Sequence, residues 1–92
     1  MANDRPASYG QCILVLDRGF VFYADHAAKN DTTGLWLATN ARCIRRWGTD
    51  KGLAQLVHGP LPQTSLDATA PALEISPAAL LFVIPCTGDW SE

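Results

Sequence analysis

Three cysteines and two histidines are the residues of this 92-residue chain best suited to nucleophilic or metal chemistry. Cys12, Cys43 and Cys86 lie far apart in the sequence, form no C-x-x-C pair, and have apolar neighbours. A free cysteine in such surroundings usually packs as a small hydrophobic side chain. His26 and His58 add too few ligands for a zinc site. We therefore expect three reduced thiols, no metal and no cofactor.

The motifs that mark common catalytic centres are missing from the sequence. No G-x-S-x-G elbow marks a nucleophilic serine. The segment Gly48-Thr-Asp-Lys-Gly52 departs from a phosphate-binding P-loop because its lysine precedes the glycine. We expect no catalytic residue and a protein that is not an enzyme. An enzyme that binds a phosphate-bearing small molecule at a helix N-terminus is the least favoured interpretation.

One segment differs in charge from the rest of the chain. Between residues 42 and 58, four Lys or Arg side chains stand against one carboxylate, a net charge of +3 in a chain of net charge −2. These side chains and the tryptophan among them form the candidate site for a partner or an anion: Arg42, Arg45, Arg46, Trp47 and Lys51. An anion would also be favoured by the N–H groups at the start of a following helix.

Two interpretations of this basic segment remain open. If residues 43–47 form a strand, Arg45 and Trp47 share a face, which suits stacking of a guanidinium on the indole. Arg46 then lies on the opposite face. The arginines either pair with carboxylates across the sheet, such as Asp17 or Asp25, or form a patch that binds a partner.

The elements that must position these residues are mostly strands. Residues 11–16 form a continuous apolar run, typical of a strand covered on both faces. Asp17-Arg-Gly19 supplies a turn, and the aromatic and β-branched residues 20–24 complete a hairpin. After a turn at residues 29–34, the sequence predicts a third strand at 35–39 and a fourth at 43–47, with a bend at Asn40-Ala41.

Residues 50–58 have the spacing of a short helix. Leu53, Leu56 and Val57 recur at i, i+3 and i+4, and Thr49 and Asp50 are suitable N-cap residues. A glycine at 59, expected in the left-handed conformation, and a proline at 60 end the pattern. So short a helix is not stable alone, so its apolar stripe must pack on the sheet.

The C-terminal part is predicted to be loop-rich from 59 to 72, with brief pairing at 65–67 and a short strand at 73–75. Residues 80–84 form the second continuous apolar run, which predicts a second central strand that ends at Pro85. We expect a mostly β fold in which five or six strands form a meander, curled into an SH3-like or partly open barrel. An α+β sheet with the helix packed flat is the alternative.

Length and composition limit the organisation and the partners. The 92 residues predict a single domain, 1–92, with residues 1–9 as a loose arm. Charged residues make up 17% of the chain against roughly 25% in an average protein, which favours self-association. A pI near 5.5 disfavours a dedicated nucleic-acid binder. We predict no membrane span and no signal peptide, and therefore a cytoplasmic protein.

The string Ile44-Arg-Arg-Trp-Gly-Thr-Asp-Lys-Gly-Leu53, continuing through Leu56 to Gly59-Pro60, resembles a family of small proteins of tailed bacteriophages and prophages. The shared segment of that family reads approximately I-R-R-W-G-T-x-K-G-L-x-x-L, and the similarity covers most of residues 11–86. The resemblance implies a phage or prophage source, a place in the host bacterial cytoplasm, and a compact domain of unknown function. It brings no catalytic residues.

Two functional hypotheses follow. The first is a phage accessory protein that acts without catalysis through protein–protein contact, either by self-assembly or by binding a host or virion protein. Arginine and tryptophan are enriched at interface hot spots, which favours it. The alternative is a small β-barrel that binds nucleic acid with the basic segment 42–51, using Trp47 as a stacking platform.

Overall fold

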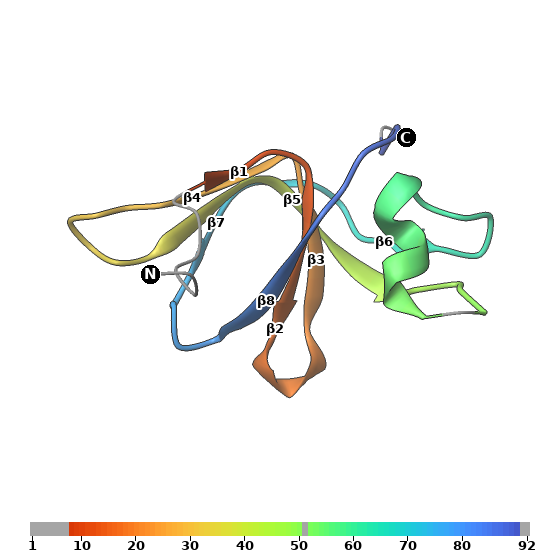
Figure 1. The fold of residues 1–92 in the computed structure, drawn as a ribbon, viewed down its shortest axis with the longest axis horizontal. Coiled ribbons are helices and arrows are strands. Elements are labelled where there is room, and N and C mark those ends of the chain that lie inside the picture. The colour runs from red at the N-terminus through yellow and green to blue at the C-terminus, as the bar shows by residue number, and fades with distance from the viewer. Residues whose placement is uncertain (1–7, 51, 91–92) are drawn as a thin grey trace.

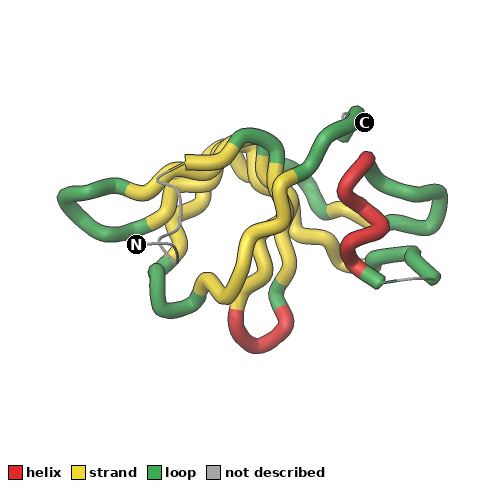
Figure 2. The backbone as a smooth tube through the Cα atoms, viewed as in Figure 1, coloured by secondary structure: helices red, strands yellow, loops and turns green. Residues whose placement is uncertain are grey.

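The computed structural model of the protein describes residues 8–50 and 52–90 and shows a mostly β chain (Figure 1). Eight strands form one antiparallel sheet in the order β1-β4-β5-β3-β2-β8, with β6 and β7 also paired to β5. The strands are β1 Ser8–Tyr9, β2 Cys12–Leu16, β3 Val21–Ala24, β4 His26–Lys29, β5 Trp36–Arg46, β6 Ser65–Leu66, β7 Ala70–Ile75 and β8 Leu80–Pro85. The sheet curls into a nearly closed, barrel-like shape (Figure 2), which confirms the predicted fold class.

The predicted first hairpin is present as β2 and β3. Cys12 pairs with Ala24 and Val15 with Val21. The connection is a short 3₁₀ turn, η1 (Asp17–Gly19), in which Gly19 has a φ of 85°. Glycine adopts this positive φ without steric cost. The apolar run of β2 is covered on both faces, as expected, because each face contacts a different core.

The two strands predicted at 35–39 and 43–47 are one continuous strand, β5, so that expectation was wrong. The predicted bend is present within it at Asn40, which has a φ of 52°. Asparagine tolerates this left-handed conformation better than most residues. The chain therefore turns a corner without losing its hydrogen-bonding register, and β5 pairs with four strands, β3, β4, β6 and β7.

The segment formed by β3 and β4, which pairs with β5, bends at the same level. β4 was not expected as a strand, and it continues the line of β3 after a bend at Asp25. The paired residues on either side are Tyr23 with Arg42 and His26 with Thr39, so Asp25 stands opposite Asn40. We call this paired bend the corner of the sheet. It is the point around which the strands begin to curl.

Two hydrophobic clusters lie on opposite faces of the β2–β3 hairpin. The first, inside the barrel, contains Cys12, Leu14, Ala24, Ala27, Trp36, Ala38, Ala41, Ile75 and Leu80. The second, outside it, contains Ile13, Val21, Tyr23, Ile44, Leu56, Cys86 and Trp90. Alternation along β2 sends successive side chains to opposite clusters. The second cluster depends on two non-strand segments that cover it, the short helix and the C-terminal residues 86–90.

The predicted helix at 50–58 is shorter and tighter than expected. It is a 3₁₀ helix, η2 (Leu53–His58), and Gly52, with a φ of 100°, occupies the N-cap without a side-chain cap. The positive φ stops an α-helix from starting earlier, so Thr49 and Asp50 do not cap it. Gly59 ends it with a φ of 123° and a ψ of 170°, outside the left-handed helical region. Among the described residues, no helix has the length and apolar character to cross a membrane.

The C-terminal half corrects two further expectations. β6 forms at the predicted pairing site, but β7 begins at Ala70, within the segment expected to be loop. β8 is the last strand of the sheet order, so it is not the central strand its apolar run predicts. Leu81 and Phe82 are each 52% exposed. The continuous apolar run reflects an edge strand with a partly uncovered surface.

Candidate functional site

The structure gives the side chains of the basic segment different surroundings. Arg45 makes a bidentate ion pair with Asp67, from Nε to Oδ1 and from Nη2 to Oδ2, each at 2.8 Å. The guanidinium lowers the pKa of the Asp67 carboxyl, chiefly through these hydrogen bonds. An arginine therefore does pair with a carboxylate, but the partner is Asp67 and not Asp17 or Asp25. The positive charge of Arg45 is largely neutralised at the surface.

Arg42 lies on the other face of β5 and is directed towards the C-terminal segment. Its Nε donates to the Asp67 carbonyl oxygen at 3.1 Å, and its Nη1 donates to the Trp90 carbonyl oxygen at 3.5 Å. These bonds connect β5 to the loop after β6 and to the end of the described chain. Arg42 therefore has a structural role.

The remaining candidates do not complete a common surface. Arg46 is exposed and forms no ion pair with a described residue. Trp47 is 41% exposed, and its carbonyl oxygen accepts a hydrogen bond from the Thr64 hydroxyl at 2.7 Å. Lys51 lies outside the described residues. The structure thus leaves Arg46 and Trp47 as the accessible described members of the predicted site.

A polar pocket of about 420 Å³ lies at the corner of the sheet. Residues from five separate parts of the chain line it: Gln11, Tyr23, Asp25, Asn40, Arg42, Thr69, Gly88, Asp89 and Trp90. The Asn40 amide donates to Asp25 Oδ2 at 3.1 Å, and the Tyr23 hydroxyl donates to Asp25 Oδ1 at 2.9 Å. One carboxylate thus holds both bent strands.

The wall of this pocket is fixed by a chain of contacts from Gln11, the residue before β2, to the C-terminal segment. The Gln11 amide donates to the Tyr23 hydroxyl at 2.9 Å and to the Gly88 carbonyl oxygen at 3.0 Å. The Tyr23 and Trp90 rings stack with centroids 4.3 Å apart. Burial, and then the neighbouring Asp25, raise the pKa of Tyr23 to about 12. The phenol is therefore protonated at neutral pH and acts as a donor to the carboxylate.

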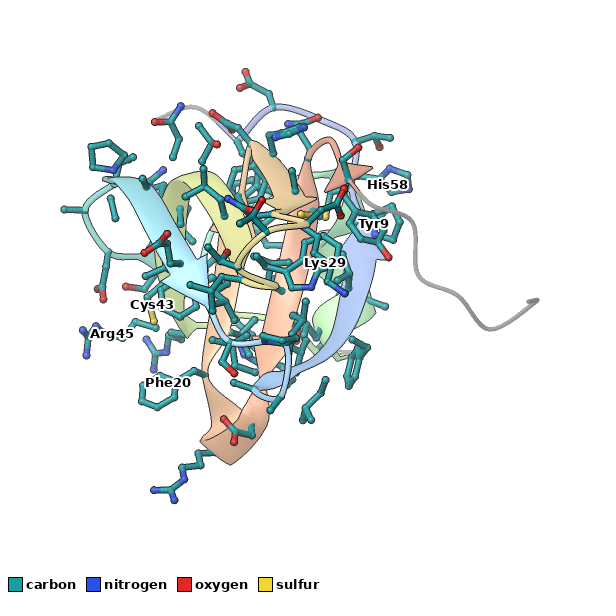
Figure 3. All side chains as sticks on the ribbon, turned by 90° about the vertical axis from the view of Figure 1, so that its left-hand side faces the viewer. Tyr9, Phe20, Lys29, Cys43, Arg45 and His58 are labelled. Carbon is teal, nitrogen blue, oxygen red and sulfur yellow. The ribbon has the colours of Figure 1, made fainter. Side chains whose placement is uncertain are left out.

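The second concave region is an apolar groove of about 330 Å³ between the β2–β3 hairpin and the β7–β8 connection. Six of the eight residues around it are apolar: Leu16, Phe20, Phe22, Leu73, Ile75 and Ala79, with Glu74 and Ser76. Phe20 is 56% exposed, and Figure 3 shows its ring standing out from the hairpin. Several of these side chains also pack against the first cluster, so the groove is an opening towards the barrel interior.

The three thiols are free. Burial raises the pKa of Cys12 to about 12 and that of Cys86 to about 11, and it also raises the pKa of Cys43. The thiolate is the reactive form of cysteine, so these thiols are poor nucleophiles at neutral pH. Within residues 8–50 and 52–90, no three His, Cys, Asp or Glu side chains come together in a way that could hold a metal ion.

Neither concave region was predicted from the sequence, because each is assembled from distant segments with no local motif. The aromatic residue directly after the predicted turn, Phe20, was the one available signal for the groove. Comparison with protein-family models, curated proteins and solved structures gave no match to this chain. The geometry thus offers two concave regions, the polar pocket and the apolar groove, besides the accessible side chains of Arg46 and Trp47.

Proposed function

We propose that the protein is a phage- or prophage-encoded accessory protein that acts without catalysis by binding a protein molecule through the apolar groove. The sequence resemblance supports the phage or prophage source, and the groove supports the choice of binding surface. The observation that carries the proposal is a hollow with six apolar lining residues, one of which is the exposed Phe20 ring. Contiguous exposed apolar surface marks interaction sites, and buried aromatic side chains dominate their energetics.

The chemistry of the titratable groups favours contact over catalysis. A nucleophile or general base must exist in its deprotonated form near neutral pH. Burial raises the pKa of Tyr23 and of Cys12 to about 12, far above that range. The Asp25 carboxylate accepts hydrogen bonds at both oxygens, which gives it a structural role at the corner.

The nucleic-acid alternative is less well supported. Binding to phosphates requires several cationic side chains on one surface, and its affinity scales with the number of phosphates neutralised. Arg45 is paired with Asp67, and Arg42 is bonded to backbone carbonyl oxygens. Arg46 and Trp47 remain, which is a small surface for a protein of net charge −2.

The test compares two surface variants in binding assays with host and phage proteins and with labelled DNA and RNA. We expect Phe20→Ala to abolish protein capture and Arg46→Glu to leave it unchanged, with both variants melting close to the parent. Phe82→Ala serves as the matched control, because Phe82 has a similar exposure of 52%. Loss of capture in Arg46→Glu alone, together with salt-sensitive nucleic-acid binding by the parent, would overturn the proposal.

A further inference from the structure

We propose that the molecule bound in the groove is a second copy of this chain, in a two-fold dimer in which each Phe20 ring enters the other copy's groove. This inference rests on the proposed function, since it names the partner of the same groove. The surface carries an exposed aromatic side chain, Phe20, at the edge of the hollow that it helps to line, and the β2–β3 hairpin and β7 supply most of this patch. A closed two-fold interface requires such self-complementarity, because the same patch on both copies meets itself.

The projection is held in place by the backbone. The Leu16 N–H donates to the Phe20 carbonyl oxygen at 2.8 Å, which closes the hairpin beneath the ring. Phe20 therefore stands on a short hydrogen-bonded turn and not on a long loop. A side chain presented in this way loses little conformational entropy when it is buried in a partner.

The hollow is suited to an aromatic ring. Its volume of about 330 Å³ exceeds what one phenyl side chain fills, and its walls include Phe22, Leu73 and Ile75. Rings packed against aromatic and aliphatic side chains gain both apolar burial and aromatic contacts. The space beyond the inserted ring is available to the rim residues of the second copy.

The charges at the two ends of the patch are complementary. Arg18 is exposed at the tip of the hairpin with a φ of 62°, and Glu74 is exposed at the rim of the groove. Neither forms an ion pair with a described residue of its own chain. If each ring enters the opposite groove, the tip of one hairpin approaches the rim of the other, which places Arg18 of one copy near Glu74 of the other. A net charge of only −2 per copy opposes this approach weakly.

Phe82 provides the matched control. It pairs with Val15, which packs with the second cluster, whereas Leu16 and Phe22 of the groove pack with the first. The two exposed phenylalanines therefore lie on opposite faces of the β3–β2–β8 part of the sheet. An association caused by general stickiness would depend on both, and the proposed dimer depends on Phe20 alone.

The experiment is sedimentation velocity over a wide concentration range, using the full chain. We expect a reversible dimer for the parent and for Phe82→Ala. Phe20→Ala should raise the dimer Kd by at least about a hundred-fold, because the two-fold axis removes two buried rings at once. Equal far-UV circular dichroism and melting temperature would show that each variant is folded.

A charge-swap mixture tests the two-fold geometry and does not depend on Phe20. Arg18→Glu places two carboxylates at each contact of its homodimer, and Glu74→Arg places two cations there, so each variant alone should be more monomeric than the parent. Mixing the two should restore dimers, since both contacts of the mixed dimer then have opposite charges. Contacts within one chain cannot produce this rescue.

The outcomes separate the inference from the proposed function. A parent that remains monomeric at high micromolar concentration, or a mixture that does not associate, overturns the dimer. If a monomeric parent still captures a different protein in a Phe20-dependent way, the groove is a protein-binding site for another partner. If neither dimerisation nor capture depends on Phe20, both the inference and the proposed function fail.

Discussion

Replacing Leu56 with alanine removes the one fully buried side chain of η2 from the second hydrophobic cluster. Leu56 is completely buried, whereas Leu53 and Val57 are only partly buried. Leu→Ala changes at fully buried sites typically cost about 2–5 kcal/mol, through the lost transfer free energy and the cavity that remains. We expect about 3 kcal/mol here.

The expected loss of stability lies below the upper end of this range because η2 can shift towards the cluster. It is a six-residue 3₁₀ helix held by one buried side chain and by backbone contacts such as the bond from the Thr87 N–H to the Val57 carbonyl oxygen, at 2.8 Å. A cover attached in this way can move inwards and fill part of the cavity. A domain of this size has a total stability of roughly 5–14 kcal/mol, so the expected loss is a large fraction of it.

The assay is equilibrium urea unfolding followed by far-UV circular dichroism, with Leu53→Ala as the control. The Leu53→Ala change should lower the free energy of unfolding by about 1 kcal/mol, since Leu53 is only partly buried and less apolar contact is lost. The difference between the two variants measures the effect of complete burial. A Leu56→Ala midpoint within error of the parent would show that η2 does not depend on this side chain, and the account of the second cluster would be wrong.

Three further results are expected. Gly88→Ala should destabilise the fold by at least about 2 kcal/mol, because Gly88 has a φ of 94° and a new Cβ there would overlap the His58 carbonyl group. A denaturation midpoint near the parent value would contradict this. Asn40→Ala should cost more stability than Asn40→Gly, since both lose the bond to Asp25 but only alanine is strained at a φ of 52°; equal midpoints would remove the argument from strain. Because burial raises the pKa of the Cys12 thiol from 9.0 to about 12, the free energy of unfolding should fall as the pH rises above about 9. At pH 8 a disulfide-exchange reagent should modify the buried Cys12 and Cys86 only after denaturation, and reaction of both in the native protein would contradict their burial.

The sequence alone determined the features that depend on neighbouring residues. The apolar run of β2, the turn at Asp17–Gly19 and the strand after it are local patterns, and they formed the expected hairpin. The turn before β5 was also predicted, and the Asn30 side chain stabilises it by accepting from the Thr32 and Thr33 N–H groups. Turn chemistry of this kind acts within a few residues, so it can be read from the chain.

Tertiary contacts decided the structure at the places where the sequence patterns were incomplete or misleading. Asn40 was recognised as a bend, but only the facing bend at Asp25 lets β5 continue through it as one strand. The apolar run of β8 resembled a central strand, and its place at the edge of the sheet depends on strand order, which hydropathy does not encode. The 3₁₀ form of η2 follows from glycines at 52 and 59 that leave six helical residues between them.

The candidate sites show the same division. The sequence identified the basic residues of β5, but it could not show that Asp67, 22 positions from Arg45, would pair with one of them. The apolar groove joins residues 16–22 to residues 73–79, and the polar pocket joins Gln11 to Trp90. Surfaces assembled from separate strands exist only once the sheet has curled. The sequence therefore specified local elements such as the first hairpin and the turn before β5. The curl of the sheet decided which side chains meet, because that curl is set by pairing between distant segments.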